Sequence, residues 1–338
     1  MKKYIKVLNF FLFLSIGAVL MYLSFKGINF GGLFDELKNA NYFWVILAIV
    51  LGVFSHLARA YRWNMLIEPL GYKPHLKNTF YAVMIGYMTN FALPRMGEIT
   101  RCGMLGKKEK IPVDALIGTV ILERGFDMII LLLLMTLVIF AKIDVFGAFI
   151  GQNVFDPLLD KVQIIFTLPS YILVILAIIP VAMLVLYFKI RHWLWSIAFL
   201  QRMKEIVKNV IRGIKTVFKM KKGLEFLLFT AIIWILYFLM TYLIFFALPA
   251  LSHLKIIDGL FILVVSSLGI SAPVQGGFGA FHWLVSSALT FYGVTREYGL
   301  VYATISHESQ TLMIVIVGLI SFILLFAGKK TGVNEQAG

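Results

Sequence analysis

This sequence has little cysteine and little charge. Cys102 is the single cysteine among 338 residues, so no disulfide bond can form within the chain. Charged residues make up 14% of the chain, where soluble globular proteins carry about 25%, and apolar residues make up 60%. We therefore exclude a soluble globular domain and expect an all-α, polytopic helical membrane protein.

Acidic residues are scarce as well, with 17 Asp and Glu against 31 Lys and Arg, which gives a net charge of +14. Such an excess can indicate a nucleic-acid partner, but here the cations lie in short loops between apolar runs. Residues 189–222 carry ten Lys or Arg and one Glu, whereas residues 141–166 carry two Lys and three Asp. This is the positive-inside pattern. We expect no nucleic-acid partner, and a multi-pass protein of the plasma or inner membrane with both termini in the cytoplasm.

Six apolar runs approach or reach the roughly 20 residues that a spanning helix needs. They lie near 7–25, 43–66, 113–140, 167–188, 224–247 and 299–327. The first run is longer than a signal-peptide core and no small-x-small cleavage site follows it, so we expect a retained helix. We expect one transmembrane domain over 1–330 and a flexible tail over 331–338.

Two further apolar segments are interrupted at bilayer depth. Hairpin 1 (about 79–106) is broken by Asn-Phe-Ala-Leu-Pro-Arg-Met-Gly-Glu at 90–98, and hairpin 2 (about 257–293) by Pro-Val-Gln-Gly-Gly-Phe-Gly at 273–279. Irregular backbone is tolerated there only where protein encloses it or it lines a cavity. If the basic loops share one side, each segment crosses an even number of times. We expect two re-entrant hairpins that enter from opposite sides, as in an inverted repeat, with the substrate site where their tips approach. Two full crossings remain an alternative for hairpin 2.

A basic amphipathic pattern covers residues 197–219. Apolar residues recur there at helical spacing and Lys or Arg residues lie between them. This pattern predicts a helix on the anionic lipids of the inner leaflet. A cytoplasmic loop that only sets the orientation of the protein accounts for the charge equally well.

Charge at bilayer depth is costly and indicates function by default. The run 43–66 carries His56, Arg59 and Arg62 at steps of three, which places them on one broad helix face. We expect this face to point into the protein. The alternative is that the arginines extend to the cytoplasmic interface.

Hairpin 1 carries Arg95, Glu98 and Arg101, again at steps of three. Two guanidinium groups can bind phosphate oxygens in bidentate fashion, and Glu98 can neutralise one of them when the site is empty. The alternative is a structural Arg-Glu-Arg cluster that fastens the hairpin.

Three more charged residues, Glu123, Arg124 and Asp127, lie within the apolar run 113–140. They predict either a proton or cation relay, or internal ion pairs that balance the arginines.

Histidines are the candidates in the second half of the chain. His282 follows the break of hairpin 2, and His307 and Glu308 lie within the last run. Adjacent residues on a helix point about 100° apart, so we do not expect His307 and Glu308 to form a zinc pair. A packing role is the alternative for both histidines.

At these positions the chain resembles the transmembrane family of lysylphosphatidylglycerol synthases and their stand-alone flippase-like relatives. The matching pieces are Asn90-x3-Pro94-Arg95-x-Gly97-Glu98-x2-Arg101, Glu123-Arg124-x2-Asp127, Pro273-x2-Gly276-Gly277-x-Gly279 and Arg59-x2-Arg62-Trp63. In the fused bacterial members this domain looks like the part that moves an aminoacylated phospholipid between leaflets, while a soluble domain makes the lipid. The resemblance implies translocation without synthesis. One departure is His282, where the family commonly has a Glu that would suit a cationic headgroup.

We expect a flippase-like lipid translocator. Its partner would be an anionic or aminoacylated phospholipid or another lipid phosphate, with no cofactor and no metal. The expected substrate-binding residues are Arg59, Arg62, Asn90, Pro94, Arg95, Glu98, Arg101, Glu123, Arg124, Asp127, Pro273, Gly276, Gly277, Gly279 and His282. A membrane-embedded enzyme or accessory subunit acting on a lipid-linked headgroup is the alternative. The lipid, the direction, the energy source and the oligomeric state, a homo-oligomer included, stay open.

Overall fold

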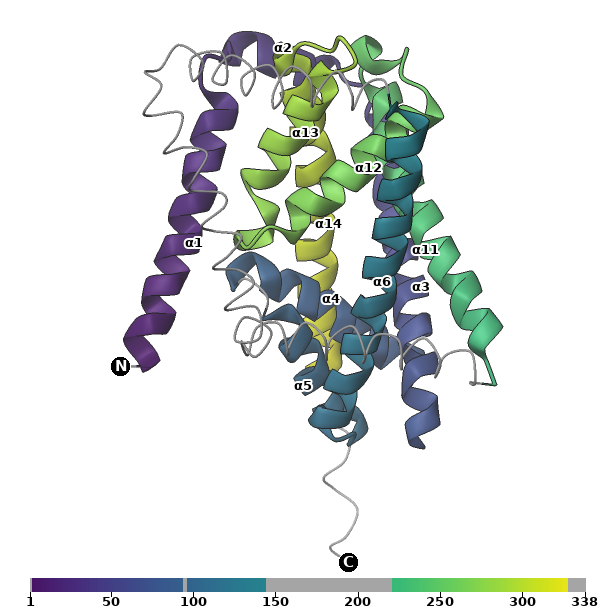
Figure 1. Ribbon diagram of the computed structural model, residues 1–338. Helices are drawn as coiled ribbons and strands as arrows, with labels where there is room; N and C mark the ends of the chain where they lie inside the picture. The colour runs from purple at the N-terminus through teal and green to yellow at the C-terminus, as the bar shows by residue number, and fades with distance from the viewer. Residues whose placement is uncertain (1, 94–95, 144–220, 328–338) are drawn as a thin grey trace, which may run out of the picture. The chain divides into compact units, whose positions relative to one another are not determined.

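Every regular element in the part of the chain that the structure describes is a helix. The computed structural model (Figure 1) describes residues 2–93, 96–143 and 221–327. The all-α prediction is therefore confirmed. The chain divides into two compact units, 1–135 with 217–338, and 136–216. The first unit holds nearly all of the described residues, and the expectation of a single domain stays a prediction.

Four of the described helices are long and apolar enough to cross a membrane. They are α3 (Tyr42–Ile67), α6 (Val113–Ala141), α11 (Gly223–Leu243) and α14 (Arg296–Ala327). A fifth candidate is α1 (Lys2–Phe25) with α2 (Phe30–Asn39), a pair bent by 88°. These helices coincide with five of the six predicted runs. The sixth, 167–188, and the predicted basic helix at 197–219 lie outside the described residues.

Short 3₁₀ turns extend or link the long helices, and asparagine side chains cap two of the helix starts. The turns are η1 (Glu68–Leu70), η3 (Ile244–Ala247) and η4 (Pro249–Leu251). Asn29 Oδ1 accepts a hydrogen bond from the backbone N–H of Gly31 at the start of α2, and Asn41 Oδ1 accepts one from Phe43 at the start of α3. Such caps satisfy N–H groups that the first helical turn leaves without a partner. These two caps fix the residues at which α2 and α3 begin.

Hairpin 1 is a helix, a break and a second helix that packs back against the first. It consists of α4 (Leu76–Ala92) and α5 (Gly97–Glu109), and Pro94 and Arg95 in the break lie outside the described residues. The two helices touch through glycines: a Cβ on Gly86 would lie 2.8 Å from the carbonyl oxygen of Gly97. Asn90 Oδ1 accepts a hydrogen bond from the N–H of Gly97 at 2.8 Å. Small residues and this bond thus close the hairpin.

Hairpin 2 has the same plan. It consists of α12 (Ile256–Ser271), η5 (Gln275–Gly277) and α13 (Ala280–Thr290), and α13 packs on α14. Gly276, Gly277 and Gly279 have φ values of +56°, +82° and +79°, which L-residues with a side chain rarely adopt. The glycines predicted to break this segment therefore make its turn.

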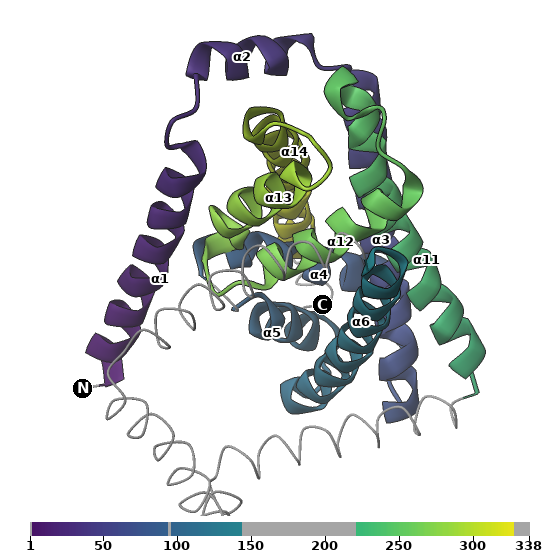
Figure 2. The same ribbon diagram turned by 45° about the horizontal axis from the view of Figure 1, so that its top comes forward.

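The breaks of the two hairpins meet. Phe91, near the end of α4, has its ring centroid 6.2 Å from that of Phe278, and it also contacts Gly276. The N-terminal helix α1 reaches the same place, where Gly17 lies against Gly279. Figure 2 shows α4 beside the yellow helix α14. The side from which each hairpin enters a bilayer, and the inverted repeat, stay predictions.

Candidate functional site

Two arginines on α3 face two carboxylates on α6. Arg59 Nη1 lies 2.6 Å from Glu123 Oε1 and 2.9 Å from Asp127 Oδ2. Arg62 Nη2 lies 2.8 Å from Asp127 Oδ1 and 3.3 Å from Glu123 Oε1. The two arginines are about one helical turn apart on α3, and the two carboxylates are about one turn apart on α6. Each arginine therefore contacts both carboxylates. The side chains of Arg62 and Glu123 are 0% exposed. Hence Arg59 and Arg62 point into the protein, the orientation expected for this helix face.

A third arginine comes from hairpin 1. Arg101 Nη2 lies 3.0 Å from Glu123 Oε2, and the guanidinium carbon of Arg101 lies 4.7 Å from the ring centroid of Trp63. The face of an indole ring attracts a cation. We call the five charged residues of α3, α5 and α6 the arginine cluster: Arg59, Arg62, Arg101, Glu123 and Asp127. The cluster ties hairpin 1 to two spanning helices.

Two hydroxyl groups on α11 complete the cluster, and neither was predicted from the sequence. Tyr237 Oη accepts hydrogen bonds from Arg59 Nε at 3.2 Å and Nη2 at 2.9 Å. Thr230 Oγ1 accepts one from Arg62 Nη1 at 3.1 Å. A signal was present, because Thr230 and Tyr237 are seven residues apart and share one face of a largely apolar helix.

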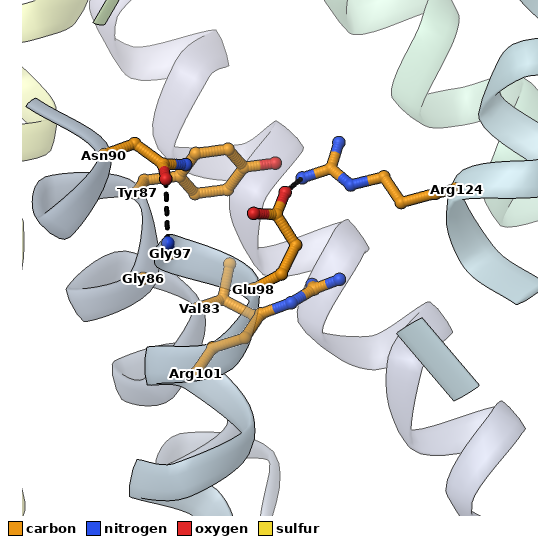
Figure 3. Close-up of a pocket in the computed structure, with 8 residues that line it drawn as sticks. All are labelled: Val83, Gly86, Tyr87, Asn90, Gly97, Glu98, Arg101 and Arg124. Atoms are coloured by element: carbon orange, nitrogen blue, oxygen red, sulfur yellow. Dashed lines mark hydrogen bonds and ion pairs between the residues drawn. The ribbon is translucent and has the colours of Figure 1, made fainter. Parts of the chain in front are cut away.

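A second, more open ion pair lies at a pocket (Figure 3). Arg124 Nη2 on α6 lies 2.8 Å from Glu98 Oε1 on α5, and the two side chains are 40% and 32% exposed. The pocket is small, with a cavity volume of about 10 Å³, and it is partly open. Its lining residues come from α4, α5 and α6, and are Val83, Gly86, Tyr87, Asn90, Gly97, Glu98, Arg101 and Arg124.

Positive charge exceeds negative charge here. Together the arginine cluster and the Arg124–Glu98 pair contain four guanidinium groups and three carboxylates, which leaves one positive charge in excess. The buried Nε atoms of Arg62, Arg101 and Arg124 have no hydrogen-bond partner among the described residues. Of these three, Arg101 and Arg124 line the pocket. The pocket is therefore lined by guanidinium groups from two helices, α5 and α6.

The predicted residues of the second half gather at the break of hairpin 2. His307 Nε2 lies 2.8 Å from the carbonyl oxygen of Gly276. His307 Nδ1 lies 3.2 Å from Glu308 Oε1, and His282 Nε2 lies 3.4 Å from the same oxygen. The side chains of His307 and Glu308 are thus in contact, although adjacent residues on a helix point about 100° apart; that they form no zinc pair stays a prediction. Their side chains converge beyond the helix surface, and His282 joins them from α13.

The structure thus forms two groups from the predicted residues. Charged residues of the first half meet around α3, α5 and α6, and the glycines and His282 of the second half meet at α14. The contact between Phe91 of hairpin 1 and Phe278 of hairpin 2 connects these two groups. Pro273 lies in the break before η5, while Pro94 and Arg95 lie outside the described residues.

Comparison with known proteins gives the family. The sequence pattern described as the lysylphosphatidylglycerol synthase TM region matches residues 10–318. The chain belongs to this family. Its members are named for an integral membrane region of a lipid-modifying system, so membership indicates a multi-pass membrane protein with a lipid-related function.

Two relatives are UPF0104 membrane proteins. A UPF0104 membrane protein of Methanocaldococcus jannaschii is 31% identical over 170 residues, which cover 49% of this chain and 47% of that protein. A UPF0104 membrane protein of Methanothermobacter thermautotrophicus is 24% identical over 334 residues, which cover 92% of this chain and 91% of that protein. The alignment thus spans about half of the first relative and nearly all of the second. No solved structure matches the chain.

Proposed function

We propose that the protein is a lipid translocator that moves a lipid-phosphate headgroup between leaflets. The observation that carries this proposal is the pocket beside the break of hairpin 1, where Arg101 and Arg124 meet next to an excess positive charge. A lipid phosphate is anionic and offers several acceptor oxygens, which guanidinium groups bind in bidentate fashion. The family's connection to a phospholipid supports the same class of cargo.

The two pocket arginines have different roles in this proposal. Arg101 is held by Glu123 and Trp63, so it presents a fixed positive charge. Arg124 is more exposed and pairs with Glu98, which a headgroup phosphate can replace as its partner. Arg59 and Arg62 do not line the pocket, and we assign them to holding Glu123 and Asp127 in position.

The acyl chains would stay in the bilayer while the headgroup passes the meeting point of the hairpins. The sequence contains no G-x4-G-K-[ST] motif for nucleotide phosphates, so movement is downhill, coupled to an ion, or driven by a partner. On the positive-inside pattern we also propose a plasma or inner membrane location with cytoplasmic termini. A transporter is proposed rather than an enzyme.

A leaflet-scrambling assay in proteoliposomes tests the proposal. Fluorescent phosphatidylglycerol, its lysyl ester and an isoprenoid phosphate are each offered to wild type, to Arg124→Gln and to Lys222→Gln. Lys222 is a matched control because it also loses one cation from an ion pair, here with Glu68 at 2.9 Å, outside the pocket. Hydrogen bonds to charged groups contribute about 1.5–3 kcal/mol, so Arg124→Gln should slow translocation at least about tenfold.

The outcomes separate function from site. Faster translocation by wild type and by Lys222→Gln, but not by Arg124→Gln, supports both. Translocation that Arg124→Gln leaves unchanged contradicts the pocket and leaves the function standing. If wild type moves none of the three lipids, the translocator is contradicted and an enzyme or accessory subunit acting on a lipid-linked headgroup takes its place.

A further inference from the structure

The second half of the chain holds a cluster of metal-ligating atoms that the proposed function does not use. His282 on α13, and His307 and Glu308 on α14, each offer one ligand atom, and these atoms all lie within 4.8 Å of one another. The side chains come from two helices that pack on each other. We propose that these three residues bind a divalent transition-metal cation of the zinc class.

Hydrogen bonding fixes the protonation of His307 and creates the need for a cation. A carbonyl oxygen can only accept, so the 2.8 Å contact with Gly276 places a hydrogen on His307 Nε2. In neutral His307 the other nitrogen, Nδ1, then carries a lone pair. That lone pair faces a carboxylate oxygen of Glu308 at 3.2 Å. Two lone pairs facing each other repel, so a proton or a metal ion lies between them.

The distances favour the metal over the proton. A hydrogen bond between a protonated histidine and a carboxylate is about 2.7–2.9 Å long. The two contacts of Glu308 Oε1 are longer, at 3.2 Å to His307 Nδ1 and 3.4 Å to His282 Nε2. Ligands about 2.0–2.1 Å from a tetrahedral zinc ion are about 3.3 Å from each other. These two spacings therefore match those of ligands around a shared ion, and all three ligand atoms lie within 4.8 Å of one another.

The surroundings also suit a bound cation. The contact of His307 with the Gly276 carbonyl is the kind of bond from the second ring nitrogen that orients metal-ligating histidines. His282 and His307 are 1% and 5% exposed, while Glu308 is 41% exposed. The ion thus has a buried floor and an accessible side. Two nitrogens and one oxygen are a donor set that zinc accepts, with a fourth position left for water or a ligand oxygen.

The metal would fasten the start of α13 to the middle of α14, directly beside the turn made by Gly276. This would hold the break of hairpin 2 against hairpin 1. The inference stands apart from lipid translocation, because metal binding is measured without any lipid transport.

The test uses the full chain, freed of any histidine tag, purified in detergent and stripped with a chelator. Zinc per protein is counted by mass spectrometry after dialysis, and Co²⁺ is added as a spectroscopic probe of coordination geometry. The variants are His282→Gln and Glu308→Gln. Glu308 is partly exposed and its replacement is nearly isosteric, so this variant keeps the test valid if His282→Gln fails to fold. His253→Gln is the control, since His253 is an exposed histidine outside the cluster.

We expect one Zn²⁺ per chain, a tetrahedral Co²⁺ spectrum, and a higher melting temperature with zinc. All three should be lost in His282→Gln and kept in His253→Gln. The affinity for Zn²⁺ should be weakened at least tenfold in Glu308→Gln. Wild type that binds no stoichiometric metal overturns the proposal and leaves a proton between His307 and Glu308. Full binding by both cluster variants overturns it as well.

Discussion

The carboxylate of Glu123 lies 2.6 Å from the guanidinium of Arg59, across two helices and with both side chains shut off from the surroundings. The same carboxylate contacts Arg62 and Arg101 as well. A single acidic residue thus compensates charge from α3 and from hairpin 1. An uncompensated charge in the interior is costly, so this relationship controls how the first half of the protein assembles.

Removing the negative charge of Glu123 should strongly destabilise the protein. Glu123→Gln leaves three buried arginines with Asp127 as their remaining carboxylate in the cluster, and breaking a buried ion pair costs about 3–5 kcal/mol. Thermal unfolding in detergent, followed by tryptophan fluorescence, measures the change. Glu225→Gln is the control, because Glu225 accepts a hydrogen bond from Tyr61 in a half-buried place away from the arginines. Equal melting of wild type and Glu123→Gln would contradict the account of the cluster.

Tyr237→Phe should destabilise the protein by about 1.5–3 kcal/mol, the range for hydrogen bonds to charged groups. The substitution removes the acceptor of two hydrogen bonds from Arg59 without changing the ring. Tyr42→Phe removes an exposed hydroxyl that donates to the Leu37 carbonyl, and it should cost less. The free energy of unfolding of both variants is measured under identical detergent conditions. A loss at Tyr42 as large as that at Tyr237 would show that the cluster adds nothing special.

Two glycines of α5 should respond in opposite ways to alanine. A Cβ on Gly97 would overlap the carbonyl oxygen of Gly86 and the side chain of Asn90, so Gly97→Ala should cost about 1–3 kcal/mol of stability. A Cβ on Gly103 meets nothing within 4 Å, so Gly103→Ala should stabilise the helix by up to about 1 kcal/mol. The melting temperatures of the two variants test this. A change of the same sign in both melting temperatures would argue against close packing of α4 and α5.

Gly276→Ala should disturb the meeting of the hairpins. Both Gly276 and Gly71 have positive φ, but a Cβ on Gly276 would also overlap the ring of Phe91, while one on Gly71 meets nothing within 4 Å. Gly276→Ala should therefore lower the melting temperature more than Gly71→Ala does. Adding Phe91→Ala should recover part of the difference, because it removes the overlapping ring. If the melting temperature of the double variant falls by the sum of the two single losses, overlap with Phe91 is not the cause of the loss in Gly276→Ala.

Glu98→Gln and Arg124→Gln should change lipid binding in opposite directions. Without Glu98, Arg124 loses its partner at 2.8 Å and is free for a phosphate. A half-exposed ion pair is worth about 0.2–1 kcal/mol, so Glu98→Gln should raise the affinity for phosphatidylglycerol by up to about fivefold. Arg124→Gln should lower it. Binding of fluorescent phosphatidylglycerol to protein in detergent measures both, and a loss in both variants would contradict the role given to Glu98.

Much of the architecture follows from local sequence properties. Long apolar runs predicted the described spanning helices, because a bilayer admits apolar helices with satisfied backbones. The proline and glycine at 94 and 97, and the glycines at 276–279, marked the two breaks, since these residue types cannot continue a helix at low cost. Steps of three placed Arg59 and Arg62 on an inward face. The hydroxyl groups of Thr230 and Tyr237 were overlooked because uncharged residues stand out little in an apolar helix.

The sequence by itself determined the membrane class, the helix positions, the two breaks and the set of charged residues that belong inside. The tertiary structure alone decided which of these groups are partners. Spacing along one helix fixes the direction of a side chain, whereas a contact between helices depends on packing and on the reach of flexible side chains. For that reason the pairing of Arg59 with Glu123, the placement of Arg101 and Arg124 at a pocket, and the contact of His282 with Glu308 are visible only in the folded chain.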